Sequence, residues 1–143
     1  MPKFHKEVTI QAPVEKVFQY LDSPTNLPEV WPSVYEVKDI ETLPEGGHRF
    51  TYTYNLAGRP SRGSMETFKH VANERIVEKT KGDIESTYEF MFEGRNGTTK
   101  VLLEADFETS TFDKKFEPFV TRWNEYEADA FMQNLKARFE LVK

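Results

Sequence analysis

Apolar residues recur at helical spacing through the last part of the chain, residues 116–142. Side chains three or four positions apart share one face of a helix, because each residue turns the helix by roughly 100°. The apolar positions form two neighbouring lines, which are Phe119, Trp123, Tyr126 and Ala130, and then Val120, Phe131, Leu135 and Val142, with Ala128, Met132 and Phe139 beside them. The lines merge into an arc of more than half the circumference. An arc this wide predicts a long helix enclosed by a curved surface.

The start of the chain predicts a strand followed by two short helices. Residues 4–10 alternate mostly between apolar and polar side chains, as a half-buried strand does. Pro13 suits the first position of a helix, where its missing N–H has no bond to lose. Pro24 separates this helix from a second, and Pro28 and Pro32 prevent the second from being long and regular.

The middle of the chain predicts strands joined by turns. Asn96-Gly97 is a strong hairpin signal, because both positions tolerate a positive φ. The segment near residues 63–71 alternates poorly, so its register is not settled by the pattern. Two strands have clear inward faces, namely His48, Phe50, Tyr52, Tyr54 and Leu56 on one and Ile84, Ser86, Tyr88, Phe90 and Phe92 on the other. The strands are expected near residues 34–43, 48–56, 63–71, 75–81, 84–93 and 101–107.

The order of these elements predicts an α+β fold in one domain, residues 1–143. Meandering strands pair with their sequence neighbours, and a long antiparallel sheet twists and curls. The terminal helix is the only predicted element long enough to cover the concave face. We therefore expect a curved antiparallel sheet of about seven strands clasping the C-terminal helix. The two short helices after the first strand should close one end.

Composition and charge narrow the classes of function. The 143 residues fit one domain with a real core. The net charge of −5 is spread evenly, so nucleic acid and anionic membrane surfaces are not expected partners. The absence of cysteine excludes disulfides, thiolate metal sites and cysteine nucleophiles. No apolar run approaches the roughly 18 residues of a membrane span, and the start has no signal-peptide pattern, so we expect a cytoplasmic protein.

Aromatic and polar residues at inward positions are the candidate chemistry. The chain has 12 Phe, 6 Tyr and 2 Trp, which fill large interiors and also line pockets. On the long helix, Asn124, Glu127, Asn134 and Arg138 fall inside the apolar arc. Burial of an unpaired charge costs several kcal/mol. Glu127 and Arg138 must therefore reach solvent at a rim, pair with another group, or contact a ligand.

Catalytic motifs are weak in this sequence. His48 is the best acid–base candidate, because alternation with Phe50 directs it inward. Its place beside Gly46-Gly47 instead favours a solvated turn histidine. The three histidines have no ligand spacing, so no metal site is predicted, and no cofactor is predicted either. There is no phosphate-binding glycine loop, serine elbow or nucleotide fingerprint.

Residues 8–34, 47–77 and 86–108 resemble a known family. The shared pattern is a strand, Ala12-Pro13, a helix, an aromatic–proline turn at Trp31-Pro32, and Gly97-Thr98 before the penultimate element. It is similar to the START-like superfamily, also called SRPBCC or Bet v 1-like, and to its polyketide cyclase/dehydrase branch. The resemblance implies the helix-grip fold, with a deep pocket between sheet and long helix for lipids, polyketides or other hydrophobic molecules. Members of the family include cyclases, carriers, chaperone activators and stress proteins, so the fold transfers better than the function.

We predict a START-like domain that binds a hydrophobic or aromatic small molecule, lipid-like or polyketide-like, as a monomer or homodimer. A cyclase or aromatase-type enzyme is the first alternative, in which the tyrosines and Asn124 polarise carbonyls and His48 or Glu127 moves protons. A protein-interaction module is the second. Convergence of polar interior groups on one spot would favour catalysis, and scattering would favour carriage. The pocket is expected to be lined by Trp31, Phe50, Tyr52, Tyr54, Tyr88, Phe90, Phe119, Trp123, Asn124 and Glu127.

Overall fold

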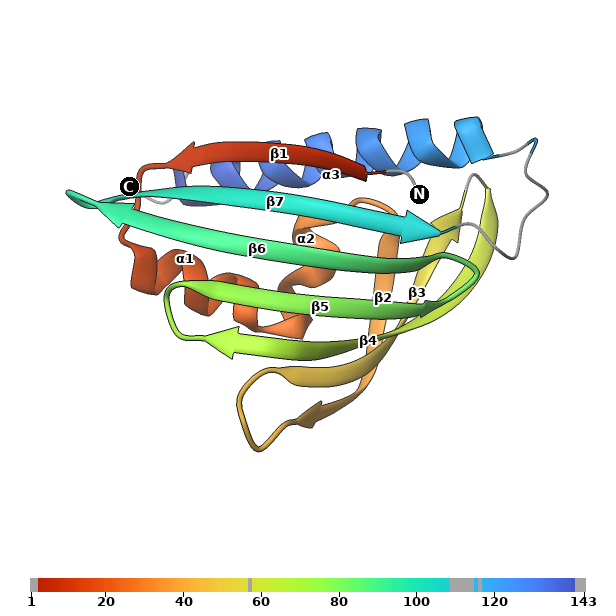
Figure 1. The fold of residues 1–143 in the computed structure, drawn as a ribbon, viewed down its shortest axis with the longest axis horizontal. Coiled ribbons are helices and arrows are strands. Elements are labelled where there is room, and N and C mark those ends of the chain that lie inside the picture. Colours follow the sequence, from red (N-terminus) through yellow and green to blue (C-terminus); the bar gives the residue numbers. More distant parts are fainter. Residues whose placement is uncertain (1–2, 57, 109–114, 116, 141–143) are drawn as a thin grey trace.

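The computed structural model describes residues 3–56, 58–108, 115 and 117–140. Its elements confirm the predicted α+β order of a strand, short helices, further strands and one long helix (Figure 1). In chain order they are β1 (Lys3–Ile10), α1 (Val14–Asp22), the 3-10 turn η1 (Pro24–Asn26), α2 (Leu27–Val30), β2 (Val34–Thr42), β3 (His48–Leu56), β4 (Arg59–Val71), β5 (Arg75–Gly82), β6 (Glu85–Arg95), β7 (Thr98–Glu108) and α3 (Glu117–Glu140).

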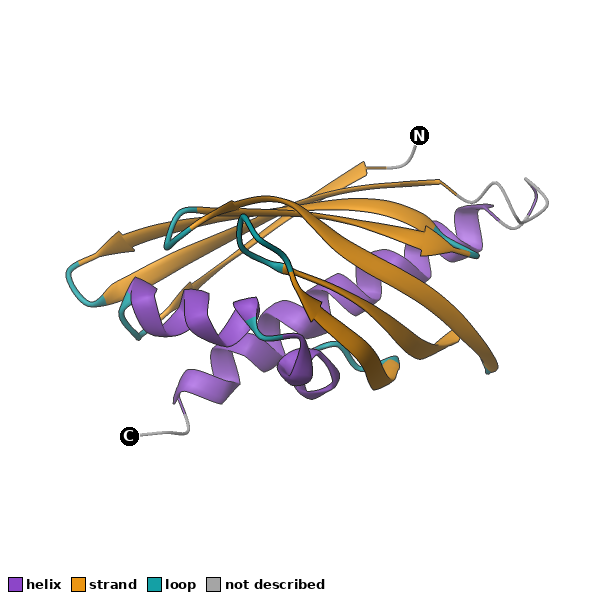
Figure 2. Cartoon of the chain, turned by 90° about the horizontal axis from the view of Figure 1, so that it is seen from below, coloured by secondary structure: helices purple, strands orange, loops and turns teal. Residues whose placement is uncertain are grey.

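The seven strands form one antiparallel sheet in the order β1-β7-β6-β5-β4-β3-β2. Every neighbouring pair except β1–β7 is joined by a short connection, so the chain meanders across the sheet. Figure 2 shows the sheet arching over the helices, which all lie on its concave side. This is the helix-grip fold that the resemblance implied.

Helix α3 is buried along a narrower face than the sequence predicts. Phe119 and Tyr126 are 56% and 71% exposed, so their assignment to the covered face is wrong. The helix runs beside β1, which is one of the two edge strands, and Lys6 of β1 forms ion pairs with Glu125 (2.8 Å) and Asp129 (3.0 Å) on the helix. Because only one side of the helix meets the sheet, Phe119 and Tyr126 of the first apolar line are left at the surface, whereas Trp123 of the same line is partly buried and lines the interior. The residues buried on α3 are Val120, Asn124, Glu127, Ala128, Phe131, Met132 and Leu135, and Val142 lies outside the described residues.

The poor alternation of β4 has a specific cause. Thr67 pairs with Glu78 and Lys69 pairs with Val77, so Phe68 is an extra residue in a β-bulge. Met65 and Thr67 before the bulge face inward, whereas the inward position after it is His70, and Phe68 itself is 58% exposed. The bulge shifts the period of two by one residue, which explains the failure of the sequence pattern.

Polar contacts fasten α2 and the turn after it to α3. The Asn134 side-chain amide donates to the Val30 carbonyl oxygen (3.1 Å), and the Ser33 backbone N–H donates to Glu127 Oε1 (2.9 Å). At the rim, Arg138 forms an ion pair with Glu29 (2.9 Å). The sequence left three alternatives for Glu127 and Arg138, namely a solvent-exposed rim, a partner group or a ligand. In the structure Glu127 is buried and hydrogen-bonded, and Arg138 lies at a rim with an acidic partner.

Candidate functional site

Three small cavities lie in a row between the concave face of the sheet and the helices. The central cavity has a volume of about 70 Å³, and the two beside it have volumes of about 30 Å³ and 40 Å³. Leu27 and Glu78 line both the central and the first cavity, whereas Trp31, Tyr52 and Tyr88 line both the central and the third. Side chains thus divide one interior space into three compartments. Since one water molecule needs roughly 15 Å³ of such volume, each compartment is large enough for only a few waters.

Aromatic rings form most of the partitions. The Trp31 ring lies 4.8 Å from that of Phe131 and 5.7 Å from that of Tyr88, measured between centroids. Tyr54 stands between Tyr52, at 5.6 Å, and Trp123, at 6.3 Å. These rings come from the turn after α2, from β3 and β6, and from α3. The interior is therefore closed by side chains that can turn about χ1 and χ2 without moving the backbone.

Most of the predicted pocket residues reach these cavities. Trp31, Tyr52, Tyr88 and Phe90 line the central cavity. Tyr54, Trp123 and Asn124 line the third cavity and Phe50 lines the first.

Two of the predicted pocket residues do not reach the cavities. Phe119 lies on the exposed side of α3 and lines none of the three, so its placement in the pocket is wrong. Glu127 is buried beside the site but lines none of them either, because its carboxylate accepts the Ser33 N–H.

Polar side chains lie near the hydroxyls of Tyr52 and Tyr88. The Tyr52 hydroxyl lies within reach of the Thr80 side chain, and the Tyr88 hydroxyl lies within reach of Ser86 and Asn124. Burial raises the pKa of Tyr88 to about 12, although Ser86 and Asn124, which lie near the hydroxyl, oppose the rise. Burial likewise raises the pKa of Tyr52 above its usual range. Both phenols are therefore neutral hydrogen-bond donors at physiological pH.

A glycine lets Tyr52 lie across the sheet. Tyr52 pairs with Gly63 on β4, and a Cβ added at Gly63 would stand 2.6 Å from the Tyr52 ring carbon that carries the hydroxyl. A side chain at this position would displace the ring. The missing Cβ thus allows the phenol to pass over β4 toward Thr80 on β5.

The third cavity contains polar atoms without partners. Asn124 is only 3% exposed, and its side-chain nitrogen bonds with none of the described residues. The hydroxyl oxygen of Ser33 in the same wall is also buried without a partner among them. A buried polar group that makes no hydrogen bond destabilises the fold by about 1–3 kcal/mol. Two such groups around one cavity indicate a site prepared for a polar atom from outside the chain.

Glu78 is a cavity residue that the sequence analysis did not single out. It lies on the concave face of β5 between Ile76 and Thr80, and it lines both the first and the central cavities. Its carboxylate makes no hydrogen bond or ion pair with any described residue. Burial raises the pKa of Glu78 to about 7, and the nearby charge of Asp22 adds to the rise. The sequence pattern of residues 75–81 could have predicted the inward position of Glu78, because Glu78 alternates in step with Ile76 and Thr80 on one face of the strand.

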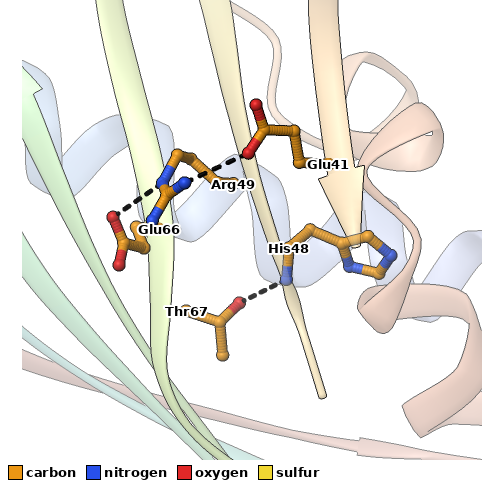
Figure 3. Close-up of polar contacts among 5 residues, drawn as sticks. All are labelled: Glu41, His48, Arg49, Glu66 and Thr67. Carbon is orange, nitrogen blue, oxygen red and sulfur yellow. Dashed lines mark hydrogen bonds and ion pairs between the residues drawn. The ribbon is translucent and has the colours of Figure 1, made fainter. Parts of the chain in front are cut away.

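His48 faces inward, as its alternation with Phe50 indicated. It is partly buried and lines the first cavity, and its backbone N–H donates to Thr67 Oγ1 (3.1 Å). Figure 3 shows its ring directed away from Arg49, whose guanidinium joins Glu66 (3.0 Å) and Glu41 (3.1 Å) across the other face of the sheet. A catalytic role for His48 stays a hypothesis, because its ring bonds with none of the described residues.

The described residues contain neither a grouped set of metal ligands nor a helix that could cross a membrane. Within the described parts of the chain, no three His, Asp or Glu side chains are grouped in a way that would hold a metal ion. None of the described helices combines the length and apolar character that crossing a bilayer requires.

Comparison with protein families agrees with this geometry. A family model described as "Polyketide cyclase / dehydrase and lipid transport" matches residues 1–140. The chain belongs to this family. No curated protein matches the chain closely enough to name a nearer relative. Membership in the polyketide cyclase/dehydrase and lipid transport family supports a hydrophobic ligand-binding domain as the general function, and it leaves the specific task open.

Solved structures share the fold of this family member at low sequence identity. A START superfamily protein from Mycobacterium smegmatis matches with a TM-score of 0.83 and 14% identity, covering 100% of both chains. The Zhui aromatase/cyclase from Streptomyces sp. R1128 matches with a TM-score of 0.80 and 14% identity over 96% of this chain and 93% of that one. The protein TTHA0849 from Thermus thermophilus has a TM-score of 0.75 and 19% identity over 99% of both chains. At these identities the likeness establishes the fold alone.

Proposed function

We propose that this domain binds a single apolar or aromatic small molecule, lipid-like or polyketide-like, in the row of cavities between the sheet and α3. The ligand enters by turning the partition rings aside and fills the three compartments as one elongated site. Burial of its apolar surface supplies about 25 cal/mol per Å², before the costs of immobilising the ligand and ordering the side chains. The proposal is supported by the family and by the aromatic lining.

The unpartnered Asn124 amide is the observation that carries the proposal. An asparagine kept for stability alone would use both ends of its amide, but here the nitrogen forms no hydrogen bond with a described residue, although the Tyr88 hydroxyl lies nearby. The Tyr88 hydroxyl, the Ser33 hydroxyl and the Asn124 amide all lie around the third cavity. A ligand carbonyl or hydroxyl placed there accepts from them and removes the penalty of the unpaired group.

The test separates stability from binding in the variant Asn124→Leu. Leucine has a similar volume and needs no hydrogen-bond partner, so we expect the free energy of unfolding in urea to stay within about 1 kcal/mol or to rise. We expect the affinity for a neutral aromatic ketone, 4-phenylbutan-2-one, to fall about 5-fold to 10-fold in an NMR titration, as the loss of one hydrogen bond implies. The exposed amide Gln133 on the same helix supplies the control variant, Gln133→Leu, which should change neither quantity. Unchanged ketone affinity in Asn124→Leu would refute the assignment of this cavity.

A cyclase-type reaction is the second candidate, and the gathering of polar groups around Tyr88 favours it. Ser86 and Asn124 lie within reach of the Tyr88 hydroxyl, and Glu78 is its cross-strand neighbour on β5. Neutral phenols polarise a ketone, and a carboxylate beside them takes a proton from the adjacent carbon, so that carbon attacks a second carbonyl of a folded chain. Incubation with a poly-β-ketone thioester tests this, because a ring product formed no faster than in buffer would leave only binding.

A further inference from the structure

We propose that the cavity selects an apolar molecule carrying a basic nitrogen, and that Glu78 is the residue that receives this nitrogen. The inference rests on the proposed binding function and adds the chemical class of the ligand. It starts from a carboxylate inside an otherwise apolar wall, which is the opposite of what a carrier of free fatty acids would need.

The position of Glu78 gives it access to a ligand. Its cross-strand neighbours are Thr67 on β4 and Tyr88 on β6, and neither is a cation. It lines the wall shared by the first and the central cavities, so a group in either can reach it. The Glu78 side chain is partly buried. A carboxylate that is largely withdrawn from water without a partner is unfavourable for the empty protein, and such groups are concentrated at functional sites.

The charged and titratable groups around Glu78 favour a cation. From α1, Asp22 adds negative charge to the first cavity, and it is paired with His70 of β4 (3.0 Å). From β3, His48 lines the same cavity, while Tyr52 of β3 and Tyr88 of β6 face the central one as neutral phenols. Among the residues that the structure describes, no Lys or Arg lines either cavity.

An anionic ligand would therefore meet repulsion in both compartments, and an ammonium group would meet complementary charge.

Two kinds of contact fix the orientation of the ligand. The basic nitrogen donates to Glu78 near the first cavity, and the apolar part extends through the central cavity between Trp31, Phe90 and Phe131. The far end reaches the Asn124 amide, whose nitrogen forms no hydrogen bond with the described residues. At a pH where Glu78 is protonated in the empty protein, binding of an ammonium ion releases one proton to solvent.

Three matched probes test the proposal, namely 4-phenylbutylamine, butylbenzene and 4-phenylbutanoate, each titrated by protein-observed NMR at pH 8. A charge-assisted hydrogen bond implies that the wild-type protein binds the amine about 10-fold or more tightly than butylbenzene, and the carboxylate most weakly. In Glu78→Gln the preference for the amine should disappear while the affinity for butylbenzene stays within about 2-fold. Glu93→Gln, which removes an exposed carboxylate from β6, should behave as wild type.

Each outcome has a distinct meaning. If Glu78→Gln keeps the preference for the amine, or if the carboxylate binds wild type as well as the amine does, the role of Glu78 is overturned and the binding function stands. If neither butylbenzene nor the amine binds the wild-type protein, the proposed function itself fails. A further readout is pH, because the preference for the amine should shrink between pH 8 and pH 5.5 in the wild type and stay flat in Glu78→Gln.

Discussion

Replacement of Glu78 by glutamine should remove a pH dependence of the wild-type stability that comes from this partly buried carboxylate. The pKa of Glu78 is raised from 4.5 to about 7 in the folded protein, chiefly by burial. Below pH 4.5 the carboxyl is neutral in both folded and unfolded states and carries no penalty. Between pH 4.5 and 7 the unfolded chain loses its proton first, so stability falls as pH rises, and above about pH 7 the penalty is complete.

The expected stability difference between Glu78→Gln and wild type follows from the raised pKa of Glu78. A difference of 2.5 between the two pKa values, 4.5 and about 7, corresponds to about 3 kcal/mol at roughly 1.4 kcal/mol per unit. Glutamine has nearly the same shape and never ionises. We therefore expect Glu78→Gln and wild type to have similar free energies of unfolding at pH 4, and we expect the variant to be more stable by about 3 kcal/mol at pH 8.

Urea unfolding followed by tryptophan fluorescence at pH 4, 6 and 8 measures this difference. The quantity of interest is the change in the variant-minus-wild-type difference between pH 4 and pH 8, because any packing effect of the amide is the same at both. Glu93→Gln provides the exposed control and should show no such change. A Glu78→Gln effect that is equal at pH 4 and pH 8 would show that the carboxylate is solvated in the folded protein, and it would remove the electrostatic basis for a cation site.

Two further predictions concern α3. Leu135→Asp places an unpaired charge at a fully buried position, so we expect a loss of several kcal/mol and an unfolded protein by circular dichroism, whereas the exposed Gln133→Asp should stay folded; a folded Leu135→Asp protein would refute the assignment of the helix face. Trp123→Ala removes a ring from the third cavity and should weaken butylbenzene binding about 5-fold or more in an NMR titration, while Tyr126→Ala on the exposed side should not; equal affinities in the two variants would place the ligand elsewhere.

Local patterns in the sequence were enough to predict the elements and the inward faces of the regular strands. Alternation with a period of two placed Phe50, Tyr54 and Tyr88 in the interior, because successive strand side chains point to opposite faces whatever the neighbours are. The two prolines after residue 26 correctly limited α2 to a short helix. These features depend only on covalent geometry and on residues close in the chain.

Other features were decided by contacts between distant segments. Helical spacing showed that Phe119 and Tyr126 lie on an apolar line with Trp123, but only the position of α3 beside β1 left these two side chains uncovered. The bulge at Phe68 depends on how β4 pairs with β5, which no period within β4 reveals. In the sequence alone, the pKa of Glu78 cannot be distinguished from that of any other glutamate. Its pKa is raised only because the curved sheet and the short helices shield the partly buried carboxylate from much of the water. Such shielding is a property of the whole enclosure and not of any one segment.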